Sequence, residues 1–206
     1  MLETLNLESV RGRRTLFRDV SFSLKGGDLL RVAGANGSGK TSLLRILCGL
    51  LTPERGEVRW QGGDIRKLRE EYSKQLVFIG HAPALKDELT AAENLSIARR
   101  ISGTDSKQEE IEEALRYFDL PEAGVPVREL SQGQRRRAVL ARLALSAEIP
   151  LWLLDEPFAA LDEAAARLTE ELIAGHVARG AAVIYTTHQK ARIEGRVLDL
   201  DAAAHA

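Results

Sequence analysis

The residues with the clearest chemistry form a glycine-rich turn at 34–41, which reads G-A-N-G-S-G-K-T. This run fits the P-loop pattern G-x-x-x-x-G-K-[ST]. Glycine permits positive φ and lets the backbone approach an anion, so consecutive N–H groups can form a concave nest for phosphate oxygens. Lys40 would add a charge at the β- and γ-phosphates, and the Thr41 hydroxyl can ligate Mg²⁺. The turn predicts a nucleotide phosphate site made of Gly34, Asn36, Gly37, Ser38, Gly39, Lys40, Thr41 and Ser42.

The residues on either side of this turn supply the structural context that a P-loop needs. Residues 28–33 read D-L-L-R-V-A, a short and mostly apolar strand, and 40–47 read K-T-S-L-L-R-I-L, with leucines spaced for one helix face. A helix that begins there would direct the positive end of its dipole at the phosphate. An ordinary glycine-rich turn is the alternative, but it would not need strand, helix, lysine and threonine together.

Two adjacent carboxylates, Asp155 and Glu156, follow an apolar stretch. Residues 151–154 read L-W-L-L, which is typical of a strand buried on both faces of a parallel sheet. Ligands of open α/β sheets gather beyond the carboxyl ends of such strands. We therefore expect Asp155 to act directly or indirectly at Mg²⁺, and Glu156 to accept a proton from a water in line with the γ-phosphate. A turn that caps a helix beginning near Asp162 is the alternative interpretation, and both can hold.

The segment 130–134, L-S-Q-G-Q, has a structural and a functional interpretation. S-x-x-Q ahead of a helical run predicts a capping box from Ser131 to Gln134. Leucines then mark the packed side of the helix, and we expect its arginines on a solvated basic side: Arg135, Arg136, Arg137 and Arg142. A capped N-terminus with Gly133 in its first turn also offers free N–H groups and a positive dipole end to an anion.

In this order the motifs resemble those of the ATP-binding-cassette (ABC) ATPases, in which two copies close face to face around two ATP molecules. In this family the segment that corresponds to 130–134 is called the signature. The resemblance implies that the signature of one chain binds the γ-phosphate held by the other protomer, through Ser131, Gly133 and Gln134. It also implies a catalytic set of Lys40, Glu156 and His188. His188 follows the strand-like residues 182–187 and matches the family's switch histidine, whereas a lone histidine after a strand is usually a surface or packing residue.

The glutamine that this family carries after the strand 76–79 is absent. The segment 80–85 reads G-H-A-P-A-L, so His81 or Ala82 occupies that place, depending on whether a gap is allowed. His81 can reach Mg²⁺ or water, and a plain loop histidine is an equal alternative.

The aromatic residue that stacks on adenine in the family is not evident either. Counting back from Val20 puts Arg11 at its place. A guanidinium can stack on a planar base, or Arg11 can be a surface residue of the basic run 11–14.

Composition indicates one soluble domain without nucleic-acid partners. A chain of 206 residues can bury one substantial core. The net charge of −1 gives no electrostatic reason to bind nucleic acid or an anionic membrane surface. The single cysteine, Cys48, excludes an internal disulfide and fits a reducing cytoplasm. We find no apolar run of about 18 residues and no signal peptide in M-L-E-T-L-N-L-E.

The overall pattern predicts an α/β fold, a RecA-like P-loop NTPase core with an inserted helical subdomain. Further strands are expected at 2–9, 15–24, 56–60 and 76–79. A capping box from Thr90 to Glu93 opens a helix that continues to 101, and a second helix carries Ile111, Leu115 and Phe118 on one stripe. We expect a single ABC ATPase domain over 1–206, with its core at 1–80 and 147–206 and its helical subdomain at 81–146. The alanine-rich end, 201–206, is expected to fray.

Two shorter segments of the chain resemble one subfamily in particular, the haem-exporter ATPases of cytochrome c maturation, the CcmA type. That type has G-H-Q-P-G and L-T-A-x-E-N-L where this chain has 80–84 and 89–95, and Ala82 is the departure. The resemblance implies a subunit that hydrolyses ATP with Mg²⁺ and forms a homodimer through an ATP sandwich. It further implies integral membrane partners, a peripheral position on the cytoplasmic face of the inner membrane, and release of a haem-loaded chaperone.

Other classes fit less well. Repair or translation-factor ABC ATPases usually carry two cassettes or a long coiled-coil insertion, and kinases or GTPases lack L-S-x-G-Q. Two alternatives stay open: a soluble or regulatory ABC-type ATP sensor with weak hydrolysis, suggested by the missing glutamine, and the ATPase subunit of another small ABC exporter.

Overall fold

The computed structural model describes residues 1–120, 124–188 and 193–203, and its strands form two sheets. The antiparallel sheet has the order β2-β1-β4-β5 and contains β1 (Leu2–Arg11), β2 (Arg14–Leu24), β4 (Arg55–Trp60) and β5 (Gly63–Asp64). The other sheet is parallel in its four pairings and has the order β6-β7-β8-β3-β9. Its strands are β3 (Leu29–Ala33), β6 (Leu76–Ile79), β7 (Leu151–Leu154), β8 (Ala182–Thr186) and β9 (Arg196–Asp199).

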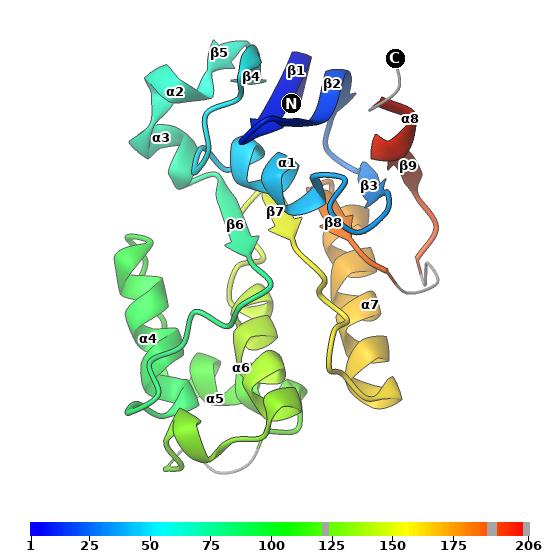
Figure 1. Cartoon of the computed structure of the whole chain (residues 1–206). Helices are drawn as coiled ribbons and strands as arrows, with labels where there is room; N and C mark the ends of the chain where they lie inside the picture. The colour runs from blue at the N-terminus through cyan, green and yellow to red at the C-terminus, as the bar shows by residue number, and fades with distance from the viewer. Residues whose placement is uncertain (121–123, 189–192, 204–206) are drawn as a thin grey trace.

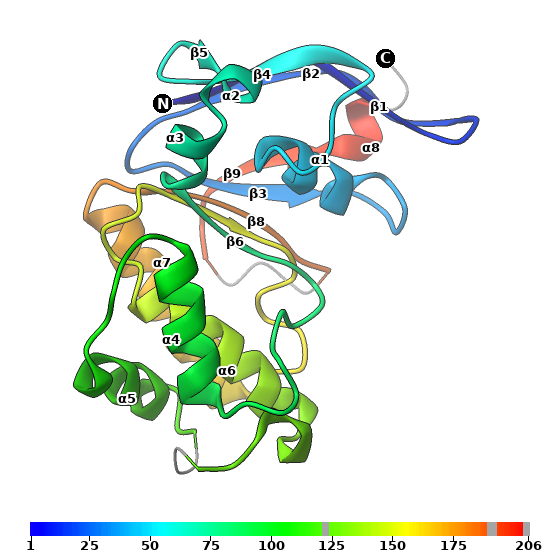
Figure 2. The same ribbon diagram turned by 90° about the vertical axis from the view of Figure 1, so that its left-hand side faces the viewer.

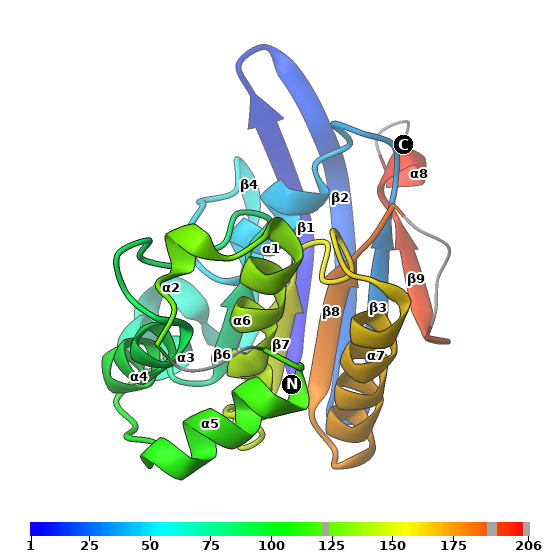
Figure 3. The same cartoon turned by 90° about the horizontal axis from the view of Figure 1, so that it is seen from below.

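The helices lie in layers on the two faces of the parallel sheet. Helix α1 (Lys40–Leu47) lies between the two sheets, as Figures 1 and 2 show. On the opposite face lie α7 (Glu163–Ala178) and a group of three helices, α4 (Ala91–Ile101), α5 (Gln108–Tyr117) and α6 (Gln132–Ala144), which Figure 3 shows from below. Short elements complete the chain: α2 (Ile65–Leu68), α3 (Glu70–Ser73), a 3₁₀ turn (Val127–Glu129) and α8 (Leu200–Ala203).

Strand β7 shows why the parallel sheet is buried on both faces. Its side chains alternate, so that Leu151 and Leu153 pack in the core between the sheets while Trp152 and Leu154 pack in the core beneath α6 and α7. All four residues are 0% exposed. This confirms the buried strand predicted from L-W-L-L, and its period of two places the following residues at the carboxyl edge of the sheet.

Local sequence signals determine where the principal helices begin. Thr90 accepts a hydrogen bond from the backbone N–H of Glu93, whose carboxylate accepts one from the N–H of Thr90, so the predicted capping box is confirmed. Asp162 likewise caps α7 by accepting from the N–H of Ala165 at 2.8 Å.

The proposed fraying of the C-terminal end is wrong for α8, which is helical, while 204–206 lie outside the described residues.

His176 is a fully buried titratable group on the last turns of α7. Its ring stacks on Trp152, with centroids 3.6 Å apart and planes 9° from parallel. Burial, assisted by the charge of Arg179, lowers the pKa of His176 from 6.5 to about 4. The folded chain therefore holds this imidazole neutral across the pH range in which the unfolded chain protonates it.

We expect the free energy of unfolding to fall as the pH drops below about 6.5, because the unfolded state then binds a proton that the folded state excludes until about pH 4. For this one group the loss between pH 7 and pH 5 is about 2 kcal/mol. His176→Phe retains an aromatic ring against Trp152 but cannot titrate. Urea unfolding at both pH values should show a smaller loss for the variant by about that amount, and equal losses would contradict the assignment.

Candidate functional site

Four neighbouring strands deliver polar residues to one edge of the parallel sheet. The P-loop turn follows β3, Gly80 and His81 follow β6, Asp155 and Glu156 follow β7, and His188 lies beyond β8. A hollow of about 250 Å³ at this edge is lined by Arg11, Leu16, Asn36, Gly37, Gly39, Lys40, Thr41, Ser42, His81, Asp155, Glu156 and His188. The structure thus brings together residues that lie far apart in the sequence.

The backbone angles and close contacts of the P-loop turn require glycine. Gly34 and Gly39 have φ of 145° and 104°, a region that L side chains rarely adopt. A Cβ on Gly34 would lie 2.5 Å from Ser38 Oγ, and one on Gly39 would lie 2.9 Å from the Phe17 ring. Lys40 is buried inside the turn, where its Nζ donates to the carbonyls of Gly34 at 2.8 Å and of Ala35 at 2.9 Å. The turn therefore places an ammonium group among closely spaced backbone groups.

Asp201 contacts this turn from the opposite end of the sequence and was missed in the sequence analysis. Its Oδ2 accepts a hydrogen bond from the N–H of Ala35 at 2.8 Å. Strand β9 and helix α8 bring it there, because β9 pairs in parallel with β3. The run V-L-D-L before Asp201 is the signal that marks this extra strand.

Asp155 is 1% exposed and joins three elements through its two oxygens. Thr41 donates to Oδ2 at 2.8 Å, and Thr186 donates to Oδ1 at 2.7 Å. Hydroxyl and carboxylate oxygens are the donors that Mg²⁺ takes from proteins, with water and phosphate oxygens completing its octahedron. Within 1–120, 124–188 and 193–203, no group of three or more His, Cys, Asp or Glu side chains is placed to hold a metal. The Thr41 hydroxyl and the Asp155 carboxylate, whose oxygens lie 2.8 Å apart, are oxygen ligands of the kind that Mg²⁺ takes.

Glu156 and His188 meet directly. Oε2 of Glu156 accepts a hydrogen bond from the backbone N–H of His188 at 3.1 Å, and Nε2 of His188 lies 3.3 Å from Oε1. Glu156 has a φ of 51°, which is uncommon for a residue with a side chain and is frequent at active sites. Its N–H donates to Thr186 Oγ1 at 2.9 Å. The backbone thus holds this carboxylate at the edge of the hollow.

The two residues that could take the place of the missing glutamine line different hollows. His81 lines the hollow with the P-loop, whereas Ala82 lines a different, apolar hollow under the helices. Arg11 ends β1 opposite Arg14 and lines the P-loop hollow.

The signature residues lie outside this hollow. Ser131 Oγ accepts from the N–H of Gln134 at 3.2 Å, and Gln134 Oε1 accepts from the N–H of Ser131 at 2.9 Å, which confirms the capping box. Gly133 packs so closely that a Cβ there would lie 3.1 Å from the carbonyl oxygen of Ala160. None of these three residues lines the hollow of its own chain.

The predicted solvated side of α6 is wrong at Arg136, which is 4% exposed. Helical spacing explains the difference, because Arg136, Leu140 and Leu143 lie at i, i+4 and i+7 on the packed face. The guanidinium donates to backbone carbonyls instead of meeting solvent.

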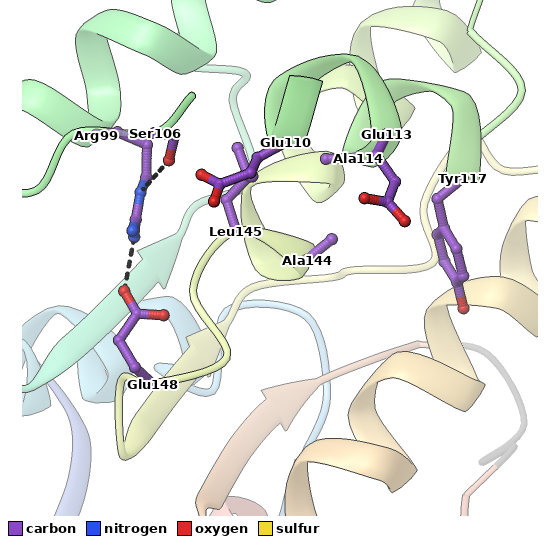
Figure 4. A pocket seen from close by; sticks show the side chains of 9 residues that line it. All are labelled: Arg99, Ser106, Glu110, Glu113, Ala114, Tyr117, Ala144, Leu145 and Glu148. Atoms are coloured by element: carbon purple, nitrogen blue, oxygen red, sulfur yellow. Dashed lines mark hydrogen bonds and ion pairs between the residues drawn. The ribbon is translucent and has the colours of Figure 1, made fainter. Parts of the chain in front are cut away.

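A separate hollow of about 460 Å³ lies among the helices and contains none of the predicted site residues (Figure 4). Arg99 bridges its wall by donating to Glu148 at 2.8 Å and to Ser106 at 3.0 Å. Glu110 and Glu113 point toward it from α5. No residue of the P-loop turn lines this second hollow.

Comparison with known proteins identifies the family of the chain. Residues 17–159 match the family model described as ABC transporter. The cytochrome c biogenesis ATP-binding export protein CcmA of Nitrosospira multiformis is 45% identical over 96% of each chain. The protein of that name from Aromatoleum aromaticum is 48% identical, over 99% of this chain and 97% of its own.

Solved structures show the same architecture. The ATP-binding cassette MJ0796, in a dimeric post-hydrolysis state bound to ADP and Pi, matches with a TM-score of 0.81 at 26% identity, over 92% of this chain and 88% of its own. The predicted P-loop NTPase fold is thereby confirmed. The chain belongs to the ABC transporter family and, within that family, to the CcmA type.

Over the part of the chain that the structure describes, no helix has the length and apolar character needed to cross a membrane.

Proposed function

We propose that the chain is the ATP-hydrolysing subunit of an ABC membrane complex that serves haem export in cytochrome c biogenesis. The observation that carries this proposal is the meeting of Lys40, Asp155 and the Glu156–His188 pair around one hollow. Relatives that share 45% and 48% of their residues over nearly the whole chain are named cytochrome c biogenesis ATP-binding export proteins, which supports the export role.

In this proposal the P-loop N–H groups and Lys40 bind the phosphates of ATP, with Thr41 and Asp155 as the residues that hold Mg²⁺. The ion supplies charge neutralisation at the β- and γ-phosphates. Glu156 accepts a proton from water as the water oxygen bonds to the γ-phosphorus, and the bond from that phosphorus to the β–γ bridging oxygen breaks to give ADP and phosphate. His188, held by Glu156, donates a hydrogen bond to the γ-phosphate.

A second copy of the chain completes the site. Ser131, Gly133 and Gln134 lie at the N-terminus of α6, where the positive end of the helix dipole favours an anion. In a homodimer closed around two ATP molecules, these groups of one chain would bind the γ-phosphate on the other. The dimeric cassette MJ0796 supports this arrangement because its fold is the same.

The integral membrane subunits are proposed to contact the segment after β6, on the cytoplasmic face of the inner membrane. Ala82, Pro83 and Ala84 are exposed there, and Leu85 is half-buried against a small apolar hollow of about 50 Å³. Asn94 keeps the following loop ordered, since it accepts from the N–H of Lys86 at 2.7 Å and donates to its carbonyl at 3.1 Å. Exposed apolar residues in an ordered segment suit a docking surface.

This placement supports the division expected from the sequence. The core of 1–80 and 147–206 would bind the nucleotide, and the helical part at 81–146 would carry the membrane contact and the signature. The place of the missing glutamine, at His81 or Ala82, lies at the junction of the two parts, so the nucleotide and the membrane partner would meet the same turn.

Leu85→Asp should abolish association with the membrane subunits while ATP binding persists, because a carboxylate cannot occupy an apolar contact without a large desolvation cost. Co-purification of the tagged chain from membranes measures this and identifies the partners. Val197→Asp is the matched control, since Val197 is 52% exposed on the edge strand β9. Aggregation or loss of cooperative melting in Leu85→Asp would show instead that Leu85 belongs to the core.

The same purification tests the proposed function as a whole. We expect cytochrome c biogenesis membrane subunits to accompany the wild-type chain, and phosphate to be released from ATP. A chain that binds ATP, releases no phosphate and carries no membrane protein would be an ATP sensor.

A further inference from the structure

Arg136 is a buried arginine whose hydrogen bonds all end on backbone carbonyls at the sheet edge. Its Nη1 donates to Gly80 at 2.9 Å, and its Nη2 donates to Asp155 at 3.0 Å and to Glu156 at 2.6 Å. Burial lowers the pKa of the Arg136 guanidinium, and the charges of Asp155 and Glu156 act in the opposite direction. A buried cation is expensive to place, so its position at these three carbonyls calls for a reason.

The three bonds determine the backbone on either side of Glu156. The carbonyl of Asp155 belongs to the peptide plane before the Glu156 Cα, and the carbonyl of Glu156 belongs to the plane after it. Thr186 fixes the first plane from its other side by accepting the N–H of Glu156 at 2.9 Å. With both planes held, the Cα–Cβ direction of Glu156 is held as well, at a φ of 51° in the sparsely populated left-handed region.

The third acceptor extends this control to a second part of the site. Gly80 immediately precedes His81, which lines the same hollow as Glu156. Arg136 itself lies on α6, whose N-cap is Ser131. The planar guanidinium of Arg136 therefore connects the signature helix α6 with the segments that follow β6 and β7.

We propose that Arg136 is a positioning residue that holds the Glu156 carboxylate in line for hydrolysis and makes its position depend on the signature helix. The proposal rests on the ATPase function proposed above. A movement of α6 when a second chain engages Ser131 would pass through Arg136 to the base. Misplacement of a catalytic group by about 1 Å can cost about 10²-fold in rate.

The test uses the full-length chain with Arg136→Gln and Arg136→Lys, measured for ATP affinity and for kcat. We expect Arg136→Gln to lower kcat by about 10- to 100-fold while the Kd for ATP changes by less than about 3-fold. Arg136→Lys should recover part of the rate, because an ammonium can donate to these carbonyls but lacks the fork. Arg99→Gln is the matched control, since Arg99 is also buried but lies at the other hollow, and its kcat should stay within about 2-fold.

A second measurement separates positioning from general support of the fold. If Arg136 acts through Glu156, adding Arg136→Gln to Glu156→Gln should cause no further loss of the slow residual rate. A full additional loss, or an unchanged kcat in a well-folded Arg136→Gln, overturns the proposal. Should Arg136→Gln fail to melt cooperatively, Arg136→Lys decides, and a wild-type kcat in that variant overturns it equally. A wild-type chain that hydrolyses no ATP would contradict the proposed function instead.

Discussion

Glu156→Gln is expected to stop ATP hydrolysis and leave ATP binding intact. Glutamine has the shape of glutamate but cannot accept a proton from the attacking water, and a positioned base contributes about 10²–10⁴-fold in rate. The neighbouring groups that hold phosphate, the P-loop and Lys40, are untouched. Phosphate release should therefore fall by that factor while the Kd measured with a fluorescent ATP analogue stays near the wild-type value.

Two comparisons show whether the loss belongs to the base. Lys40→Ala should weaken ATP binding itself, since it removes a counter-charge from the phosphates. Glu71→Gln, an exposed glutamate on α3, should change neither quantity. Unchanged turnover in Glu156→Gln would remove Glu156 from the mechanism and leave the proton acceptor to another group.

Chains that carry Lys40→Ala and chains that carry Ser131→Arg should each be inactive alone and active when mixed. In a heterodimer, the intact P-loop of the Ser131→Arg chain faces the intact signature of the Lys40→Ala chain. The other composite site has lost both halves. With random pairing, half of the dimers hold one working site of two, so the mixture should reach about a quarter of the wild-type rate per chain. Phosphate release as a function of the mixing ratio measures this.

The alternative is that Ser131 only caps α6. Ser131→Arg would then lower the stability by about 1 kcal/mol and leave ATP-driven dimerisation intact. Thr90→Arg provides the matched control, because Thr90 is the N-cap of the equivalent capping box on α4. Thr90→Arg should lose similar stability yet hydrolyse ATP when it is the only chain present, and a Ser131→Arg chain that is equally active alone would contradict a role of the signature in trans.

What the sequence could predict about this site was carried by short-range signals. The P-loop turn needs glycine where φ is positive, and both capping boxes follow from residues three positions apart. Strand β7 could be recognised because four consecutive apolar residues match a strand with two buried faces. These rules depend on neighbours in the chain, so a single sequence contains them.

Long-range contacts could not be predicted in the same way. The charge of Arg136 suggested an exposed side chain, although the residue lies on the packed face of α6. Its three carbonyl acceptors lie 19, 20 and 56 positions away in the sequence, so no local pattern indicates them. Asp201 reaches Ala35 across 166 positions, through the pairing of β9 with β3. Likewise, only the folded chain distinguishes His81, which lines the nucleotide hollow, from Ala82, which does not.

The central claim is that two copies of this chain enclose ATP between the P-loop of one and the signature of the other. Native mass spectrometry of Glu156→Gln with MgATP tests it most directly, because the variant should accumulate the state before hydrolysis. The account predicts that Glu156→Gln forms a dimer that holds two ATP molecules. It also predicts that the double variant Glu156→Gln, Ser131→Arg stays monomeric. A monomer that binds one ATP at saturating nucleotide, or a dimer unaffected by Ser131→Arg, would contradict it.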